Sequence, residues 1–180
     1  MQLKAWNFAV LAAVAALWIV TGTQREKPVV SASHAAKLRG LEETALQTPS
    51  NPDKLRELAQ AYIDARNPGM AVQAIEAAHE EVRKDPTVEH VYARALIEQG
   101  RSQDALAAER RVLERCAQLD PPGAANATPR CSSWLIASAT RRADILRELV
   151  QLGVEDAQAY PEKSALAYHN AIRQVGLALH

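Results

Sequence analysis

The residue types that most often carry catalysis or hold metal ions are dispersed in this sequence. No histidine has a second histidine or a carboxylate at metal-ligand spacing in a pattern that rises above chance, and GxSxG, HExxH and a glycine-rich phosphate loop are absent. Acid pairs and arginine pairs fit solvated helix faces. The sequence therefore predicts no enzyme activity, no metal site and no cofactor. The residues considered are His34, His79, His90, His169, His180, Glu42-Glu43, Glu80-Glu81, Arg110-Arg111 and Arg141-Arg142.

The only two cysteines, Cys116 and Cys131, stand at the ends of a segment with three prolines and one glycine. The flanking sequences read as successive antiparallel helices, whose adjoining ends would bring the thiols within reach of a disulfide. Such a bridge closes a loop of about 15 residues, stabilises the fold by roughly 3 kcal/mol and implies an oxidising compartment. Two inert buried thiols are the alternative. Redox or metal chemistry is disfavoured, because no CxxC motif or nearby histidine is present.

The overall composition is that of closely packed helices. The sequence has 48% hydrophobic but only 4% aromatic residues, and alanine and leucine supply most of the apolar content. The formal net charge is zero, so nothing indicates a nucleic-acid binder that works by bulk electrostatics. We expect an all-α protein that does not bind nucleic acid.

The N-terminal segment 1–24 is predicted to be a signal anchor. Residues 5–24 carry no charge and lie between Lys4 and Arg25, and a helix of that length, about 30 Å, matches the hydrocarbon core of a bilayer. Trp6 and Trp18 lie near its ends, where aromatic rings favour the membrane interface. A cleaved signal peptide and a buried core helix are the alternatives, but no clear cleavage pattern follows and no polar stripe is present.

The orientation of this anchor rests on two conflicting signals. More basic residues follow the span than precede it, which by the positive-inside rule would leave the C-terminal domain in the cytoplasm. The cysteine pair argues for the opposite side, and long domains translocate largely regardless of flanking charge. We expect a single-pass protein with its helical domain outside the cytoplasm, in the periplasm if it is bacterial.

Residues 25–50 are predicted to form a tether and a leading helix. The helical pattern in SHAAKLRGLEETALQ places Leu38, Leu41 and Ala45 on one stripe, with Leu46 on or beside it. The run TPSNPD at 48–53 then breaks the helix.

Residues 51–119 contain an internal repeat with a period of 34 residues. The first unit has a turn at Asn67-Pro68-Gly69, and Gly100 stands at the turn of the second unit. Asp85-Pro86 closes the first unit, and Asp120-Pro121 closes the second. The paired positions are Leu58 and Tyr92, Ala59 and Ala93, Tyr62 and Leu96, Arg66 and Gly100, Ala71 and Ala105, and Ala78 and Val112.

This pattern resembles the tetratricopeptide repeat, in which small residues lie where the two helices of a unit pack together. The resemblance implies a solenoid of helical hairpins. Two positions depart from it: Glu109 stands where the family favours a large apolar residue and the first unit has Ile75, and Glu89 lacks the usual apolar or aromatic character.

The remaining chain is predicted to hold an insert and a degenerate third unit. Residues 120–130 form the insert that the disulfide would close, and 131–180 form the third repeat with a capping helix. A helix over 131–153 has Leu135, Ala139, Ile145, Leu146 and Leu149 near one stripe, and 154–164 reads as an enlarged turn. The last helix runs from about Pro161 to Ala178, with Ala165 and Ile172 on its inner face.

The resemblance also implies a binding surface, because tetratricopeptide arrays line their concave wall with the first helix of each unit. Arginines and isoleucines at these positions would suit an extended peptide with carboxylates and an apolar anchor. The alternative is that the arginines pair with neighbouring acids such as Glu57 or Glu98. The lysine–asparagine clamp of some family members is absent. The predicted protein-binding residues are Arg56, Gln60, Ile63, His90, Arg94, Ile97 and Arg147.

These features together predict a membrane-anchored scaffold that binds or assembles a protein or peptide partner at the membrane, as an accessory or chaperone-like factor. The partner would be a membrane or exported protein. A second hypothesis is a structural accessory subunit of a larger membrane complex, bound through its transmembrane helix and a helical face.

Overall fold

The computed structural model describes residues 32–119 and 130–177, all of which belong to the compact unit Ala32–His180. The predicted anchor 1–24, the tether that follows it and most of the predicted insert lie outside the described residues. Within the described ranges, no helix has the length and apolar character needed to cross a bilayer.

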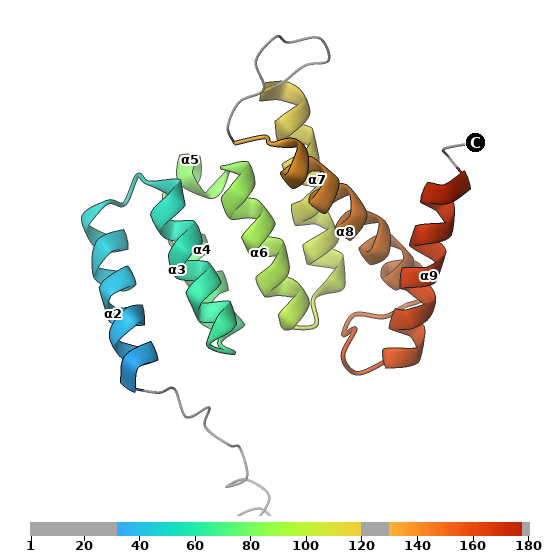
Figure 1. The fold of residues 1–180 in the computed structure, drawn as a ribbon, viewed down its shortest axis with the longest axis horizontal. Coiled ribbons are helices and arrows are strands. Elements are labelled where there is room, and N and C mark those ends of the chain that lie inside the picture. Colours follow the sequence, from blue (N-terminus) through green and yellow to red (C-terminus); the bar gives the residue numbers. More distant parts are fainter. Residues whose placement is uncertain (1–31, 120–129, 178–180) are drawn as a thin grey trace, which may run out of the picture. The chain divides into compact units, whose positions relative to one another are not determined.

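The described part of the chain is helical and contains no strand, so the all-α prediction is confirmed. Successive helices lie side by side in a row from α2 to α9 (Figure 1). Helix α6 packs against α3, α4 and α7, and α8 packs mainly against α7 and α9. The helices are α2 (Ala32–Gln47), α3 (Pro52–Asp64), α4 (Pro68–Glu76), α5 (Glu80–Arg83), α6 (Pro86–Glu98), α7 (Ser102–Leu119), α8 (Ser133–Gln151) and α9 (Pro161–Leu177).

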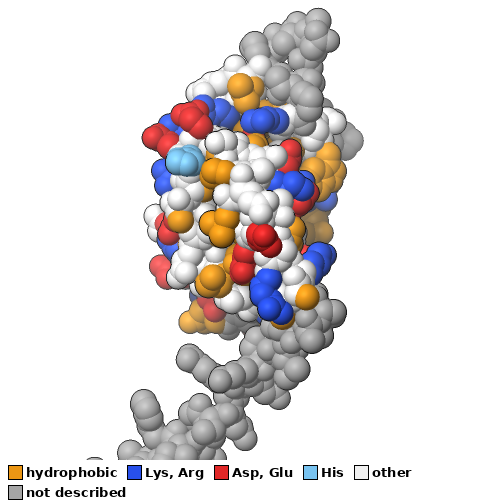
Figure 2. Space-filling model, turned by 90° about the vertical axis from the view of Figure 1, so that its left-hand side faces the viewer, with side chains coloured by type: hydrophobic (Ala, Val, Ile, Leu, Met, Phe, Trp, Pro, Cys, Tyr) orange, Lys and Arg blue, Asp and Glu red, His pale blue; other side chains and the backbone are white. Residues whose placement is uncertain are grey.

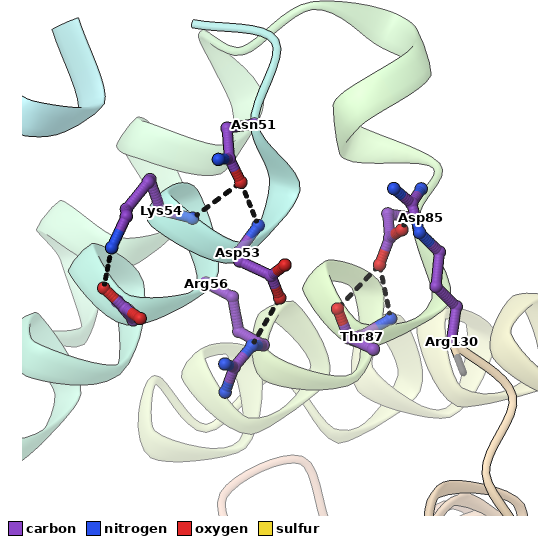
Figure 3. A network of polar contacts seen from close by, with 8 residues as sticks. Asn51, Asp53, Lys54, Arg56, Asp85, Thr87 and Arg130 are labelled. Carbon is purple, nitrogen blue, oxygen red and sulfur yellow. Dashed lines mark hydrogen bonds and ion pairs between the residues drawn. The ribbon is translucent and has the colours of Figure 1, made fainter. Parts of the chain in front are cut away.

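Helices α3 and α6 begin 34 residues apart and are started by equivalent caps. The side chain of Asn51 accepts hydrogen bonds from the backbone N–H groups of Asp53 and Lys54, and Asp85 accepts one from that of Thr87 (Figure 3). Each cap satisfies N–H groups that have no partner inside the helix, and each is followed by a proline, which favours a helix start.

Three helices end in the same way. Arg66, Gly100 and Gly153, which follow α3, α6 and α8, have positive φ angles of 58°, 73° and 66°. In each case the next residue donates to the carbonyl five positions back, for example Asn67 to Tyr62, and the positive-φ residue donates three positions back. This is the Schellman motif, in which a left-handed residue closes the last turn. The same terminator therefore shapes the turns that follow α3, α6 and α8.

The predicted apolar stripes form the core. Small residues allow the helices to approach closely, since Ala59, Ala71, Ala93 and Ala105 have no exposed surface. Leu58, Tyr62, Ile75 and Leu96 are also buried, as the periodicity predicted. A second, smaller cluster joins α7 to α8 around the cysteines and contains Val112, Cys116, Cys131, Leu135 and Ala139.

Three details of the predicted elements are wrong. The second helix of the first unit is divided into α4 and α5, because the chain leaves the helix after Glu76. Leu46 is 81% exposed and does not join the stripe of α2. In α9, Ala165 is exposed and Ile172 is 48% exposed, whereas Ala167 and Ala171 are buried. The turn 154–160 sets that register, and its shape could not be read from helical spacing.

Candidate functional site

The residues predicted to line the concave wall are only partly brought together. Arg56 and Gln60 are half-buried on α3, and Arg94 and Ile97 are half-buried on α6. The guanidinium of Arg94 lies 3.7 Å from Oδ1 of Asp64, which also accepts a 2.7 Å hydrogen bond from Nε2 of Gln60. This interaction joins α3 to α6 along one polar surface.

That surface continues into the turn between α8 and α9. Nε2 of Gln158 donates to Oε2 of Glu98 at 3.3 Å. We call this set the polar strip, and it consists of Arg56, Gln60, Asp64, Arg94, Glu98 and Gln158.

The other three predicted wall residues lie elsewhere. Ile63 is 4% exposed and His90 is 6% exposed, so both belong to the interior and the prediction that they face a ligand is wrong. Arg147 does not extend the row, because α8 packs on α7, and Arg147 lies in a shallow groove with Leu106 and Arg110 of that helix.

The arginines pair with neighbouring acids, as the alternative hypothesis proposed, but the partners differ from those expected. Arg56 lies 3.7 Å from Asp53 (Figure 3). Arg147 lies 2.8 Å from Asp144, in addition to the contact between Arg94 and Asp64. Two of these three pairs are long and exposed on both partners, so they contribute little to stability.

The turns are held to one another by specific contacts. Both the backbone N–H and the hydroxyl of Ser102 donate to the carbonyl of Glu155, at 3.2 and 2.5 Å. A Cβ at Gly100 would lie 2.9 Å from Cβ of Asp156, so this position needs glycine for space as well as for its φ angle. The turn that follows α6 is therefore joined to the turn between α8 and α9, which carries Gln158 of the polar strip.

A buried polar network connects α6, α7 and α8. Nδ1 of His90 lies 2.8 Å from Oε2 of Glu109, and Nη1 of Arg142 donates to Oε1 of Glu109 at 2.7 Å and to the carbonyl of His90 at 3.0 Å. Glu109 is completely buried. Because a carboxylate can only accept, Nδ1 of His90 carries the hydrogen. Nε2 of His90 lies 3.2 Å from the hydroxyl of Ser138.

This network explains one departure from the repeat pattern and overturns one prediction. Glu109 replaces an apolar core residue because His90 and Arg142 provide it with hydrogen bonds and opposite charge. The prediction that Arg142 lies on a solvated face is wrong, since its side chain is only 25% exposed. The sequence signal was the acid at an apolar position, but nothing in the sequence pointed to Arg142 as its partner.

The contacts from Ser138 through His90 to Glu109 have the serine–histidine–acid order of a hydrolase triad. The surroundings of these residues do not suit that chemistry. Ser138 lies inside α8, where neighbouring backbone N–H groups are used by the helix and cannot form an oxyanion hole. Ser138 does not line the groove between α8 and α9 or the groove between α2, α3 and α4. We therefore interpret the network as a structural link. Within the described ranges, no group of three or more potential ligands could hold a metal ion.

Two further ion pairs connect the N-terminal half of α6 to α7 and to Arg130, next to Cys131 of the disulfide. Arg111 is exposed, as predicted, and it donates to Oε1 of Glu89 at 2.5 Å. Burial raises the pKa of Glu89 above its ordinary value, and the hydrogen bond from Arg111 opposes this. Arg130 donates to Oδ2 of Asp85 at 2.8 Å, which ties it to the cap of α6 (Figure 3).

The predicted disulfide is present between Cys116 and Cys131, with a Cα–Cα distance of 5.4 Å. It joins the last turns of α7 to the start of α8, and both cysteines are buried. The bridge and the pair of Arg130 with Asp85 hold both ends of the segment that contains the insert.

Two apolar grooves lie at opposite ends of the row of helices. One has a volume of about 550 Å³ and lies between α8 and α9, with Ile145, Tyr168 and Ile172 among its lining residues. The other has a volume of about 520 Å³ and lies between α2, α3 and α4, next to Leu46, Tyr62 and Met70.

Comparison of the chain with protein-family models, with curated proteins and with solved structures gave no match. The geometry of the site therefore carries the functional argument.

Proposed function

We propose that this protein is a membrane-anchored, tetratricopeptide-like scaffold that holds a protein partner outside the cytoplasm. The observation that carries this proposal is the return of one helical unit after 34 residues, in its cap (Asn51 and Asp85) and in its terminator (Arg66 and Gly100). Stacked units of this kind present extended surfaces to protein partners.

The polar strip is the binding surface in this proposal. It carries charges of both signs over two helices, and the pairs of Arg56 with Asp53 and of Arg94 with Asp64 are long, at 3.7 Å, and exposed. Breaking such exposed pairs costs little free energy, so their arginines can bind the carboxylates of a partner instead. An extended peptide with acidic side chains fits this surface best.

The membrane and compartment parts of the proposal have separate support. The uncharged segment 5–24 has the length of a membrane span, and the disulfide suits an oxidising compartment. Attachment to a membrane raises the effective concentration of a membrane-bound partner, so that weak contacts with the strip suffice.

A photo-crosslinking residue at Gln60 tests the binding surface in intact cells. We expect a defined partner to be captured there and not from Gln73, an exposed position on α4. Reversal of charge in the double variant Arg56→Glu, Arg94→Glu should abolish capture, whereas reversal of the exposed pair Arg101→Glu, Arg110→Glu should not. If the strip variant still assembles normally with its partner, the surface is wrong and the accessory-subunit hypothesis is favoured.

A membrane-impermeant thiol reagent tests the compartment. On intact cells, Cys116 and Cys131 should be labelled only after reduction under denaturing conditions that leave the membrane sealed. Labelling that requires permeabilisation would place the helical domain on the other side.

A further inference from the structure

Both ends of the row of helices expose apolar side chains. A helix that ends such an array normally has a polar outer face, and large exposed apolar residues in clusters mark interaction surfaces. Among the described residues, most exposed large apolar side chains lie on α2 and the start of α4 or on α8, α9 and the turn between them. They are Leu46 and Met70 at one end and Trp134, Ile136, Tyr160, Leu166, Tyr168 and Ile172 at the other.

The groove between α8 and α9 has an apolar lining and an uncompensated positive charge. Tyr168 and Ile172 line it from α9, where they are 49% and 48% exposed. Arg141 lines it from α8 and is exposed, and it forms no ion pair with the described part of the chain. The carboxylate of Asp144 in the same groove is already paired with Arg147. A ligand for this groove should therefore combine an apolar side chain with a carboxylate.

The outer side of α2 provides this combination. Leu46 is 81% exposed, and Glu43, one turn earlier, is exposed and, within the described ranges, bonded only to Gln47 on the same helix. A Cβ at Gly40, a further turn back, would have no neighbour within 4 Å in the described part of the chain, so this side of the helix is accessible. Figure 2 views the molecule from the side on which α2 lies and shows solvent-exposed apolar side chains between charged ones.

We propose that the α8–α9 groove of one copy receives helix α2 of a second copy, with Leu46 against Tyr168 and Ile172 and with Glu43 paired to Arg141. The contact joins different surfaces of the two copies, so it propagates into short chains of molecules instead of closing as a two-fold dimer. The packing of helix on helix then continues from α9 of one copy to α2 of the next. This inference goes beyond the proposed function and does not depend on the polar strip.

The oligomeric mass of the full chain in mild detergent, measured by light scattering over a wide range of concentration, tests this contact. We expect the wild type to form oligomers whose mass rises with concentration. Leu46→Asp and Ile172→Asp should each be monomeric, because each removes one of the two surfaces. Both side chains are about half-exposed or more, and circular dichroism confirms that the variants are folded. Gln73→Asp on α4 serves as the matched control and should behave as the wild type.

A mixture of the two monomeric variants gives the sharpest result. Each retains the surface that the other lacks, so an equimolar mixture should form a dimer and nothing larger. Glu43→Arg and Arg141→Glu should each weaken association about tenfold or more, and the two together should recover most of it.

Three results would overturn the proposal. The wild type could remain monomeric at every concentration, which would leave the groove to a different protein. Leu46→Asp could still form a dimer, which would indicate contact between two α8–α9 grooves. The mixture of variants could also fail to associate.

Discussion

His90 on α6 and Glu109 on α7 form a direct contact of 2.8 Å between side chains that are 8% and 0% exposed. Both residues stand where the repeat would place something else, a surface residue at 90 and an apolar core residue at 109. Arg142 and Ser138 of α8 cover the pair. Helix α8 is therefore attached to α6 and α7 by polar interactions in the interior as well as by the disulfide.

Removal of the central carboxylate should be costly. Glu109→Ala leaves Arg142 and His90 without their buried partner, and we expect the free energy of unfolding to fall by about 3 kcal/mol or more. Urea denaturation measures this change. Glu114→Ala, at an exposed position on the same helix, should stay within about 0.5 kcal/mol of the wild type. Equal effects of the two variants would contradict the structural role of the network.

An apolar replacement of both charges should recover part of the loss. In Glu109→Leu, Arg142→Leu no charge is left unpaired, so the double variant should lose less stability than the two single variants together. The expected coupling is more than about 1 kcal/mol. A strictly additive result would show that the two residues act independently.

Opposite effects are expected at the two equivalent helix ends. Arg66 holds a φ of 58° at which a Cβ is unfavourable, so Arg66→Gly should stabilise the protein by about 0.5–1 kcal/mol. Gly100→Ala adds a Cβ that approaches Asp156 to 2.9 Å, and it should destabilise by more than that amount. Thermal unfolding of the two variants, compared with the wild type, gives the sign of each change.

The disulfide should contribute measurably to stability. Cys116→Ser, Cys131→Ser opens a loop with a sequence separation of 15, and the expected loss is about 3 kcal/mol. A reducing agent should lower the stability of the wild type by a similar amount and leave the double variant unchanged. Unfolding curves with and without reductant therefore check both the bond and its energetic role.

Glu89 should make stability decrease with pH over a defined interval. Burial raises its pKa in the folded state above the ordinary 4.5, so the folded protein binds this proton more tightly than the unfolded chain. The contribution of Glu89 to stability is then most favourable below pH 4.5 and decreases as the pH rises through the folded-state value. Glu89→Gln should remove this decrease.

The difference in unfolding free energy between Glu89→Gln and the wild type, measured in urea at a series of pH values, should therefore grow in favour of the variant as the pH rises. Arg111→Gln provides a second readout. Arg111 opposes the upward shift of the pKa of Glu89, so its loss should extend the decrease to higher pH. A difference that does not vary with pH would contradict this assignment.

The class of the described fold, the positions of its main helices and most of its buried residues could be predicted from the sequence alone. Helical periodicity reports which side of a helix is apolar, and the 34-residue offset shows that two such helices are equivalent. Ala59 and Ala93 could therefore be assigned to the core in advance. The disulfide could be predicted because only two cysteines exist and both lie at helix ends.

The neighbours that cover each helix could not be predicted, because they depend on contacts between distant parts of the chain. His90 has the position of a surface residue, but it is buried because α8 crosses it with Ser138 and Arg142. Ile172 has the spacing of a core residue, but it is exposed because the turn after Gly153 sets a different register for α9. Periodicity describes one helix at a time, whereas the path of the chain through a turn decides which neighbour that helix meets. Such paths depend on contacts like that of Ser102 with Glu155, which join residues far apart in the sequence.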